Sequence, residues 1–120
     1  MVTNHKHNER MANMTFSSAF PHYVAKIEKK GRSIEELYQV IQWLTGFDKN
    51  EINQAISDKL TFKAFFEFAT LNKNSALIKG SICGYKIEEI DNALTKKVRI
   101  LDKLIDELAK GKKLEKIFRA

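Results

Sequence analysis

The sequence contains very few of the residues that interrupt regular structure or cross-link a chain. It has one proline, five glycines and one cysteine in 120 residues. With so few breakers, long secondary-structure elements are expected. A single cysteine excludes an intramolecular disulfide and fits a reducing compartment. We therefore predict a cytoplasmic protein that is stabilised by its core rather than by a cross-link.

Long hydrophobic runs are also lacking. No stretch of about 18 apolar residues is present, so no membrane-spanning helix is expected, and residues 1–15 lack the apolar segment of a signal peptide. Hydrophobic residues make up 43% of the chain and charged residues 30%, which are the values of a globular protein. We expect residues 14–120 to form one helical domain, and residues 1–13, which show no periodicity, to form a disordered tail.

Amphipathic patterns predict helices along most of the chain. Ser33 with Glu36 and Asp48 with Glu51 have the spacing of capping boxes. Further helices are expected near residues 18 and 61, from residue 91, and after Gly111. The predicted fold is an all-α, single-domain orthogonal bundle of about five or six helices. Its predicted core is Phe20, Val24, Ile27, Leu37, Ile41, Leu44, Ile56, Phe62, Phe66, Leu101, Ile105 and Leu108.

Residues 76–90 are ambiguous between two structures. They are apolar at intervals, with Gly80 and Gly84 four residues apart. Helical turns would use these glycines for close backbone packing, whereas a pair of short strands would use Gly80 as a turn. We favour helical turns and irregular chain, with a short extended segment near 77–87 as the alternative.

The segment from Asp91 to Ala120 contains the longest helical pattern. Its apolar residues Leu94, Val98, Leu101, Ile105 and Leu108 alternate at spacings of four and three, as on one helix face. Asp91 is suited to cap its start, and Gly111 to end it. The stripe at 94–108 also has the pattern of a parallel dimer seam. We favour burial inside the chain's own core, with a homodimer through 94–108 as the alternative.

Basic residues are concentrated in the second half of the chain. Residues 61–120 hold 13 of the 21 Lys and Arg residues but only 8 of the 15 Asp and Glu residues. An excess of positive charge favours anionic partners such as nucleic acid. The candidate nucleic-acid-binding residues are Lys96, Lys97, Arg99, Lys112, Lys113 and Lys116. A solvated helix face with interleaved Asp and Glu is the simpler interpretation.

A second candidate for nucleic-acid binding is a helix-turn-helix unit at residues 34–59, with Gly46 in its turn. Its second helix would present Lys49, Asn50, Asn53, Gln54 and Ser57 to bases and phosphates. Glu51 and Asp58 on the same helix leave its charge balanced, which disfavours contact with phosphates. An ordinary helix corner is therefore the preferred interpretation.

Catalytic chemistry has only two candidate residues. Cys83 is the sole thiol, and the neighbouring Lys79 and Lys86 could favour its thiolate. A thiol nucleophile also needs a base, for which His22 is the candidate. His5 and His7 alone do not make a metal site, and no cofactor motif is present. A buried structural thiol is the preferred interpretation.

Four stretches together resemble a family of small bacterial proteins known as domain of unknown function 2200. They are Phe-Ser-Ser-Ala-Phe-Pro-His-Tyr at 16–23, Gln-Trp-Leu-Thr-Gly-Phe at 42–47, the segment 77–90 with Ile-Lys-Gly-Ser-Ile-Cys-Gly-Tyr, and Arg-Ile-Leu-Asp-Lys-Leu-Ile-Asp-Glu-Leu-Ala-Lys-Gly at 99–111. Ala93 stands where the family has a proline. The resemblance implies a bacterial, cytoplasmic source and brings no activity with it.

These patterns predict a small cytoplasmic interaction module without catalysis. A nucleic-acid-binding protein is the second hypothesis and a thiol-dependent enzyme using Cys83 is the third. No metal, cofactor or membrane contact is expected.

Overall fold

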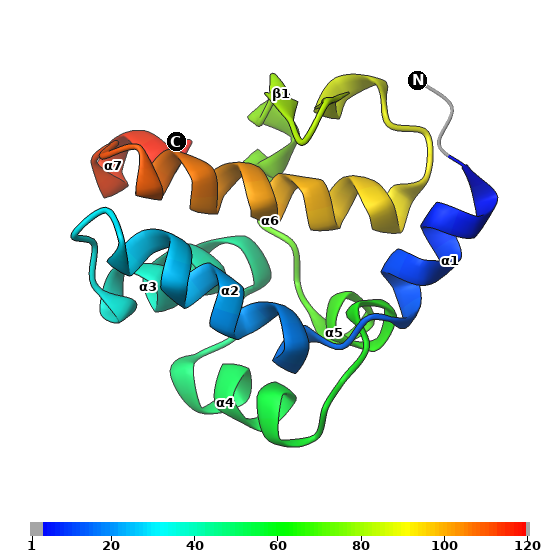
Figure 1. The fold of residues 1–120 in the computed structure, drawn as a ribbon, viewed down its shortest axis with the longest axis horizontal. Helices are drawn as coiled ribbons and strands as arrows, with labels where there is room; N and C mark the ends of the chain where they lie inside the picture. The colour runs from blue at the N-terminus through cyan, green and yellow to red at the C-terminus, as the bar shows by residue number, and fades with distance from the viewer. Residues whose placement is uncertain (1–3, 120) are drawn as a thin grey trace.

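The computed structural model describes residues 4–119, and most of them are helical (Figure 1). The elements are, in order, α1 (His5–Asn13), α2 (Phe16–Glu28), α3 (Ile34–Thr45), α4 (Lys49–Ser57), α5 (Phe62–Phe68), the 3-10 helix η1 (Lys73–Leu77), β1 (Ser81–Ile82), β2 (Tyr85–Lys86), the 3-10 helix η2 (Ile87–Glu89), α6 (Ala93–Ala109) and α7 (Leu114–Ile117). The all-α prediction is confirmed. The six expected helices correspond to α2–α7, and α1 is additional.

The capping boxes form as the sequence predicts. At the start of α3, the Ser33 hydroxyl accepts a hydrogen bond from the Glu36 N–H at 3.2 Å, and the Glu36 carboxylate accepts one from the Ser33 N–H at 3.1 Å. Asp48 and Glu51 make the same reciprocal pair at the start of α4, at 2.8 and 3.0 Å. Each box satisfies two backbone donors that a helix end otherwise leaves unpaired.

The start of α6 corrects one prediction, since its cap is Asn92 rather than Asp91. The Asn92 side-chain oxygen accepts a hydrogen bond from the Thr95 N–H at 2.9 Å. The end of α6 agrees with prediction, because Gly111 has φ +92° just beyond the last turn. A left-handed residue there costs glycine little and stops the helix.

The long helix α6 is the centre of the fold. Figure 1 shows it between the β1–β2 hairpin on one side and α2 and α3 on the other, and it also contacts α1, α5 and α7. Its buried apolar residues are Val98, Ile100, Leu101, Leu104, Ile105, Leu108 and Ala109. Most of the face at 94–108 therefore packs inside the chain, as the favoured interpretation expects, and Leu94 is partly buried against the same core. No helix within residues 4–119 combines the length and apolarity needed to cross a bilayer.

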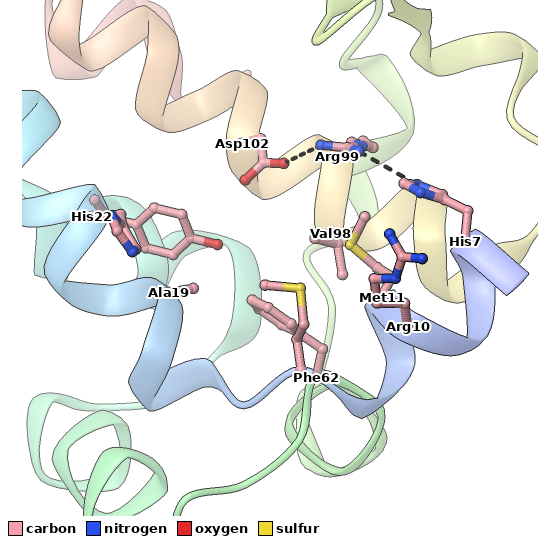
Figure 2. Close-up of a pocket in the computed structure, with 11 residues that line it drawn as sticks. His7, Arg10, Met11, Ala19, His22, Phe62, Val98, Arg99 and Asp102 are labelled. Carbon is pink, nitrogen blue, oxygen red and sulfur yellow. Dashed lines mark hydrogen bonds and ion pairs between the residues drawn. The ribbon is translucent and has the colours of Figure 1, made fainter.

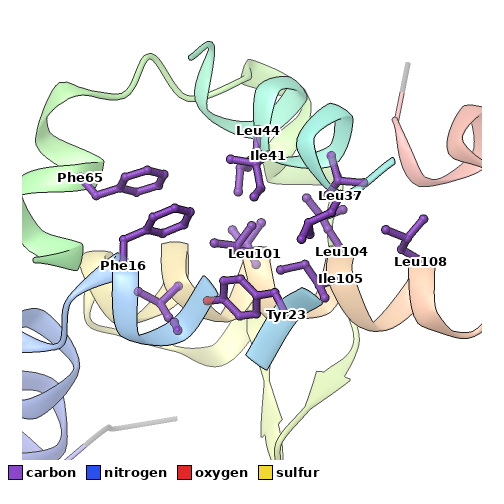
Figure 3. Close-up of a cluster of buried hydrophobic side chains, with 14 of the residues drawn as sticks. Phe16, Tyr23, Leu37, Ile41, Leu44, Phe65, Leu101, Leu104, Ile105 and Leu108 are labelled. Atoms are coloured by element: carbon purple, nitrogen blue, oxygen red, sulfur yellow. The ribbon is translucent and has the colours of Figure 1, made fainter. Parts of the chain in front are cut away.

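An aromatic cluster joins α2 to α5. Figure 3 shows the Phe16 and Phe65 rings face to face, with centroids 4.2 Å apart and planes 8° apart. A short antiparallel bridge between Thr15 and Thr61 holds the two helix starts together. Nine of the twelve predicted core residues are buried, and the other three, Phe20, Val24 and Ile56, are partly buried against the same cluster.

Residues 77–87 contain the short extended segment that was the alternative prediction. β1 and β2 pair antiparallel, with Ser81 opposite Lys86. The turn is not at Gly80, as predicted, but at Cys83 and Gly84, whose φ angles are +51° and +81°. Two consecutive positive φ values are the geometry of a type I′ turn, which matches the twist of a two-stranded hairpin.

The predicted disordered tail is wrong for residues 5–13, which form α1, and residues 1–3 lie outside the described residues. The Asn4 side chain caps α1 by accepting from the Lys6 N–H at 2.8 Å. The Thr95 hydroxyl donates to the Asn8 side chain at 2.7 Å, and Met11 is buried. The segment has one core residue, Met11, and no apolar stripe, so its sequence did not predict a helix. Polar contacts such as the Asn8–Thr95 hydrogen bond help to dock α1.

Candidate functional site

A pocket of about 330 Å³ lies where α1, α2, α5 and α6 meet (Figure 2). Its apolar lining consists of Met11, Met14, Ala19, Phe62 and Val98. Its polar lining consists of His7, Arg10, His22, Tyr23, Arg99 and Asp102. An apolar concavity with a few convergent polar groups is the usual form of a small-molecule site.

The backbone places the apolar wall of this pocket. The Phe62 N–H donates to the Met14 carbonyl at 2.8 Å, and the Phe16 N–H donates to the Leu60 carbonyl at 2.8 Å. These bonds join the α1–α2 linker to the start of α5. Met14 and Phe62 are thereby held next to each other at one side of the pocket.

A largely buried ion pair forms the α6 side of the pocket. The Arg99 Nη1 donates to the Asp102 carboxylate at 3.1 Å, and their side chains are 13% and 19% exposed. Burial raises the pKa of Asp102, and the positive charge of Arg99 opposes that rise. Burial also raises the pKa of Tyr23 well above its ordinary value, and the charge of Asp102 raises it further. The Tyr23 side chain therefore stays protonated next to the Asp102 carboxylate.

The Arg99 guanidinium is occupied on its other sides as well. Its Nη2 lies 3.4 Å from the His7 Nε2, and its centre lies 5.0 Å from the centroid of the Tyr85 ring, a cation–π distance. The His7 and Tyr85 rings stack with centroids 5.7 Å apart. The buried Arg99 Nε has no hydrogen-bond partner within residues 4–119. Arg99 therefore organises the walls around it and has little capacity left for a nucleic acid.

A smaller cavity of about 200 Å³ shares His22, Tyr23 and Asp102 with this pocket and is also lined by Cys83. The structure thus brings the two catalytic candidates, Cys83 and His22, to one cavity. In the described part of the chain no hydrogen bond joins them. Cys83 is exposed at the hairpin turn, not buried as the preferred interpretation held. A thiol nucleophile needs a base within hydrogen-bond reach, so the pairing of Cys83 with His22 stays a prediction.

The remaining nucleic-acid candidates fall into two separated groups. Lys96 and Lys97 lie in the first turn and a half of α6, whereas Lys113 and Lys116 lie beyond its end. At 1.5 Å per residue, the helix separates the groups by roughly 20 Å. Lys112 approaches Glu107 with its Nζ at 3.6 Å. The six residues therefore do not make one continuous basic surface.

The helix-turn-helix candidate exists as α3, a turn at Gly46, and α4. Three of its candidate reading residues already contact protein groups. Lys49 pairs with Glu35 at 2.9 Å, Asn53 accepts a hydrogen bond from Tyr38, and Gln54 donates to Asp58 at 2.9 Å. These contacts are what an ordinary helix corner makes.

A shallow groove of about 430 Å³ runs between α1, α5 and the start of α6. Its charged lining alternates in sign, with Glu9 and Glu67 near Lys63 and Lys97. This groove is more open and more polar than the 330 Å³ pocket, and its four charged residues are two of each sign. The pocket at Arg10 is therefore the stronger candidate site.

Sequence reasoning missed the residues that define this site. Arg10 and His7 lie in the segment predicted to be a tail, and Asp102 was interpreted as part of a solvated face. The spacing of Arg99 and Asp102, three apart on a helix, was the one local signal for their pairing. Tyr23 lies on the apolar face of α2, and its place next to Asp102 of α6 is decided by tertiary packing.

Comparisons with known proteins add a family and a fold. The family model described as "Uncharacterized protein conserved in bacteria (DUF2200)" matches residues 10–119. The crystal structure of uncharacterized protein SP1917 is similar over 91% of this chain and 90% of that chain, with 37% sequence identity and a TM-score of 0.85. No curated protein matches the chain. Neither description names an activity, so the site itself must carry the functional argument.

Proposed function

Because the chain belongs to the DUF2200 family, whose description names no activity, we propose from its site that it is a non-catalytic module that binds a small organic molecule. The binding site is the pocket between α1, α2, α5 and α6. The observation that carries the proposal is the pocket's composition, with methionine and phenylalanine walls beside the largely buried Arg99–Asp102 pair. Methionine side chains adapt to varied ligand shapes, which suits a binding role.

Binding is favoured over catalysis because the one carboxylate of the site, Asp102, is committed to Arg99. Arg99 holds the Asp102 carboxylate at 3.1 Å, and burial raises the pKa of Asp102. A general acid or base needs a proton that it can exchange with a substrate, within hydrogen-bond reach. Groups paired in this way shape and rigidify a pocket instead. We place this module in the cytoplasm, for which the single cysteine is the supporting feature.

A ligand titration tests this proposal. Isotope-labelled protein is mixed with a panel of neutral, anionic and cationic small organic compounds, and backbone amide shifts are recorded. We expect a subset of compounds to shift amides of α1, α2 and α6 around the pocket. The substitution Ala19→Leu fills the pocket and is expected to weaken binding at least tenfold.

The matched control is Ala25→Leu, which makes the same change at an exposed position of the same helix. Thermal unfolding checks that both variants fold, since adding bulk to a packed site costs about 1–3 kcal/mol. If Ala19→Leu binds the active compounds as tightly as Ala25→Leu, the pocket is not the binding site. If no compound shifts these amides, the proposal is wrong.

A further inference from the structure

Resting on the proposed function, we propose that the pocket selects small amphipathic carboxylates. The ligand's carboxylate binds Arg10 at the mouth of the pocket, and its apolar body lies against Met11, Phe62 and Val98. The inference rests on the charge and the exposure of the lining residues.

The charge of the lining favours a monoanion. Two arginines and one carboxylate, Asp102, line the pocket. Asp102 is paired with Arg99 at 3.1 Å, which leaves Arg10 as the uncompensated cation. The Arg10 side chain is exposed, and within residues 4–119 its guanidinium has no acceptor. A guanidinium presents a planar fork of donors that matches a carboxylate.

The distribution of exposure favours an amphipathic molecule. Met11 and Phe62 are 7% and 1% exposed, so the inner wall is dry and apolar. Met14 is 42% exposed beside Arg10, so apolar and cationic groups meet at the mouth. Figure 2 shows Arg10 and Met11 rising from α1, with Ala19 and His22 of α2 on the facing side and Phe62 below and between them. A molecule with an apolar body and one acidic end complements this arrangement.

The same features argue against other ligand classes. A phosphate dianion calls for several convergent charged donors, and this mouth offers one unpaired arginine. An amine would meet Arg10 without a free carboxylate to accept it. The volume of about 330 Å³ is at the lower end of the range for small-molecule sites, so one small molecule fills it.

Isothermal titration of the full chain with octanoate, octanol and octylamine tests the inference. We expect octanoate to bind at least tenfold more tightly than octanol, and octylamine to bind most weakly. Shorter carboxylates are expected to lose about fourfold in affinity per methylene removed, since each buried methylene contributes a constant increment. Equal affinities for octanoate and octanol would overturn the carboxylate preference while leaving the binding function standing. Absence of binding by all three compounds would overturn the proposed function itself.

The role of Arg10 is tested by substitution. Arg10→Gln is expected to abolish the preference for octanoate over octanol, and Arg10→Lys to restore part of it. Lys29→Gln removes one exposed cation from the end of α2, outside the pocket, and is expected to leave the preference unchanged. If Arg10→Gln keeps the full preference, or if Lys29→Gln loses it equally, then Arg10 is not the anchor and the preference reflects only the protein's overall positive charge.

Discussion

At the scale of single residues, Arg32 joins the start of α3 to the end of α6. Its Nε and Nη2 donate to the two Glu36 carboxylate oxygens at 3.1 and 2.7 Å. Its Nη1 donates to the carbonyls of Leu108 and Lys112 at 3.0 and 2.8 Å. The last carbonyls of a helix lack partners within it, and a cation there is favoured by the helix dipole. One guanidinium thus supports two helix ends.

Glu36 is expected to make stability depend on pH. The hydrogen bond from Arg32 lowers the pKa of Glu36 to about 2. The pKa of glutamate in an unfolded chain is about 4.3. The stabilisation of the folded state by ionised Glu36 is therefore fully present above that pH and is lost as pH falls through about 2. The pair is partly exposed, so we expect Glu36→Gln to cost about 1 kcal/mol at pH 7. Urea unfolding between pH 2 and pH 7 measures it.

The control that isolates the contribution of Glu36 is the substitution Glu28→Gln. Glu28 is an exposed glutamate of α2 without an ion pair in the described residues. This variant is expected to keep the wild-type loss of stability between pH 4 and pH 2, whereas Glu36→Gln flattens it. The attribution to Glu36 fails if both variants show the same pH dependence.

At the scale of elements, α1 depends on polar tertiary contacts. The Thr95 side chain is fully buried, and its hydroxyl donates to the Asn8 side chain at 2.7 Å. The His7 ring stacks on Tyr85 of the hairpin. Since α1 contributes His7, Arg10 and Met11 to the pocket, its docking also completes the candidate site.

Asn8→Ala is expected to loosen α1. The substitution leaves the buried Thr95 hydroxyl without an acceptor, which costs about 1–3 kcal/mol. Hydrogen exchange of the α1 amides should accelerate more than exchange in α3. Asn13→Ala, at an exposed position of α1, serves as the control. Equal exchange in the two variants would show that the Asn8 contact does not hold the helix.

At the scale of the whole molecule, α6 determines which surfaces remain free. Its apolar face is enclosed by helices of its own chain, and Arg99 is enclosed by Asp102, His7 and Tyr85. The candidate lysines of α6 and α7 lie in groups at the two ends of α6, and other exposed lysines lie on α2 and near α4. The net charge of +6 is therefore spread over the surface rather than concentrated in one patch.

Nucleic-acid binding is expected to be weak, because few cations can reach one duplex together. If about two lysines engage phosphates at a time, the slope of log affinity against log salt is about −2, since each contact contributes about −0.9. Fluorescence anisotropy with a labelled duplex at several salt concentrations measures this slope. A slope of log affinity against log salt of about −5 would mean that the six candidate residues act together, contrary to this expectation.

Local signals were enough to predict much of the fold. The capping boxes at Ser33 and Asp48 and the apolar stripe of α6 depend on residues three or four apart, whose geometry any helix supplies. The hairpin turn at Cys83 was harder to foresee. Cysteine has no preference for positive φ, and Gly84 alone did not reveal which pair of residues would turn.

The sequence by itself determined that the protein is helical and where most of its helices begin, because these features depend on neighbouring residues. Only the tertiary structure decided that residues 5–13 form a helix, since that helix is held by Thr95 and Tyr85 from distant segments. The same holds for the candidate site. Arg10, Tyr23, Phe62 and Asp102 come from four helices, and no spacing along the chain encodes a pocket that the packing of those helices creates.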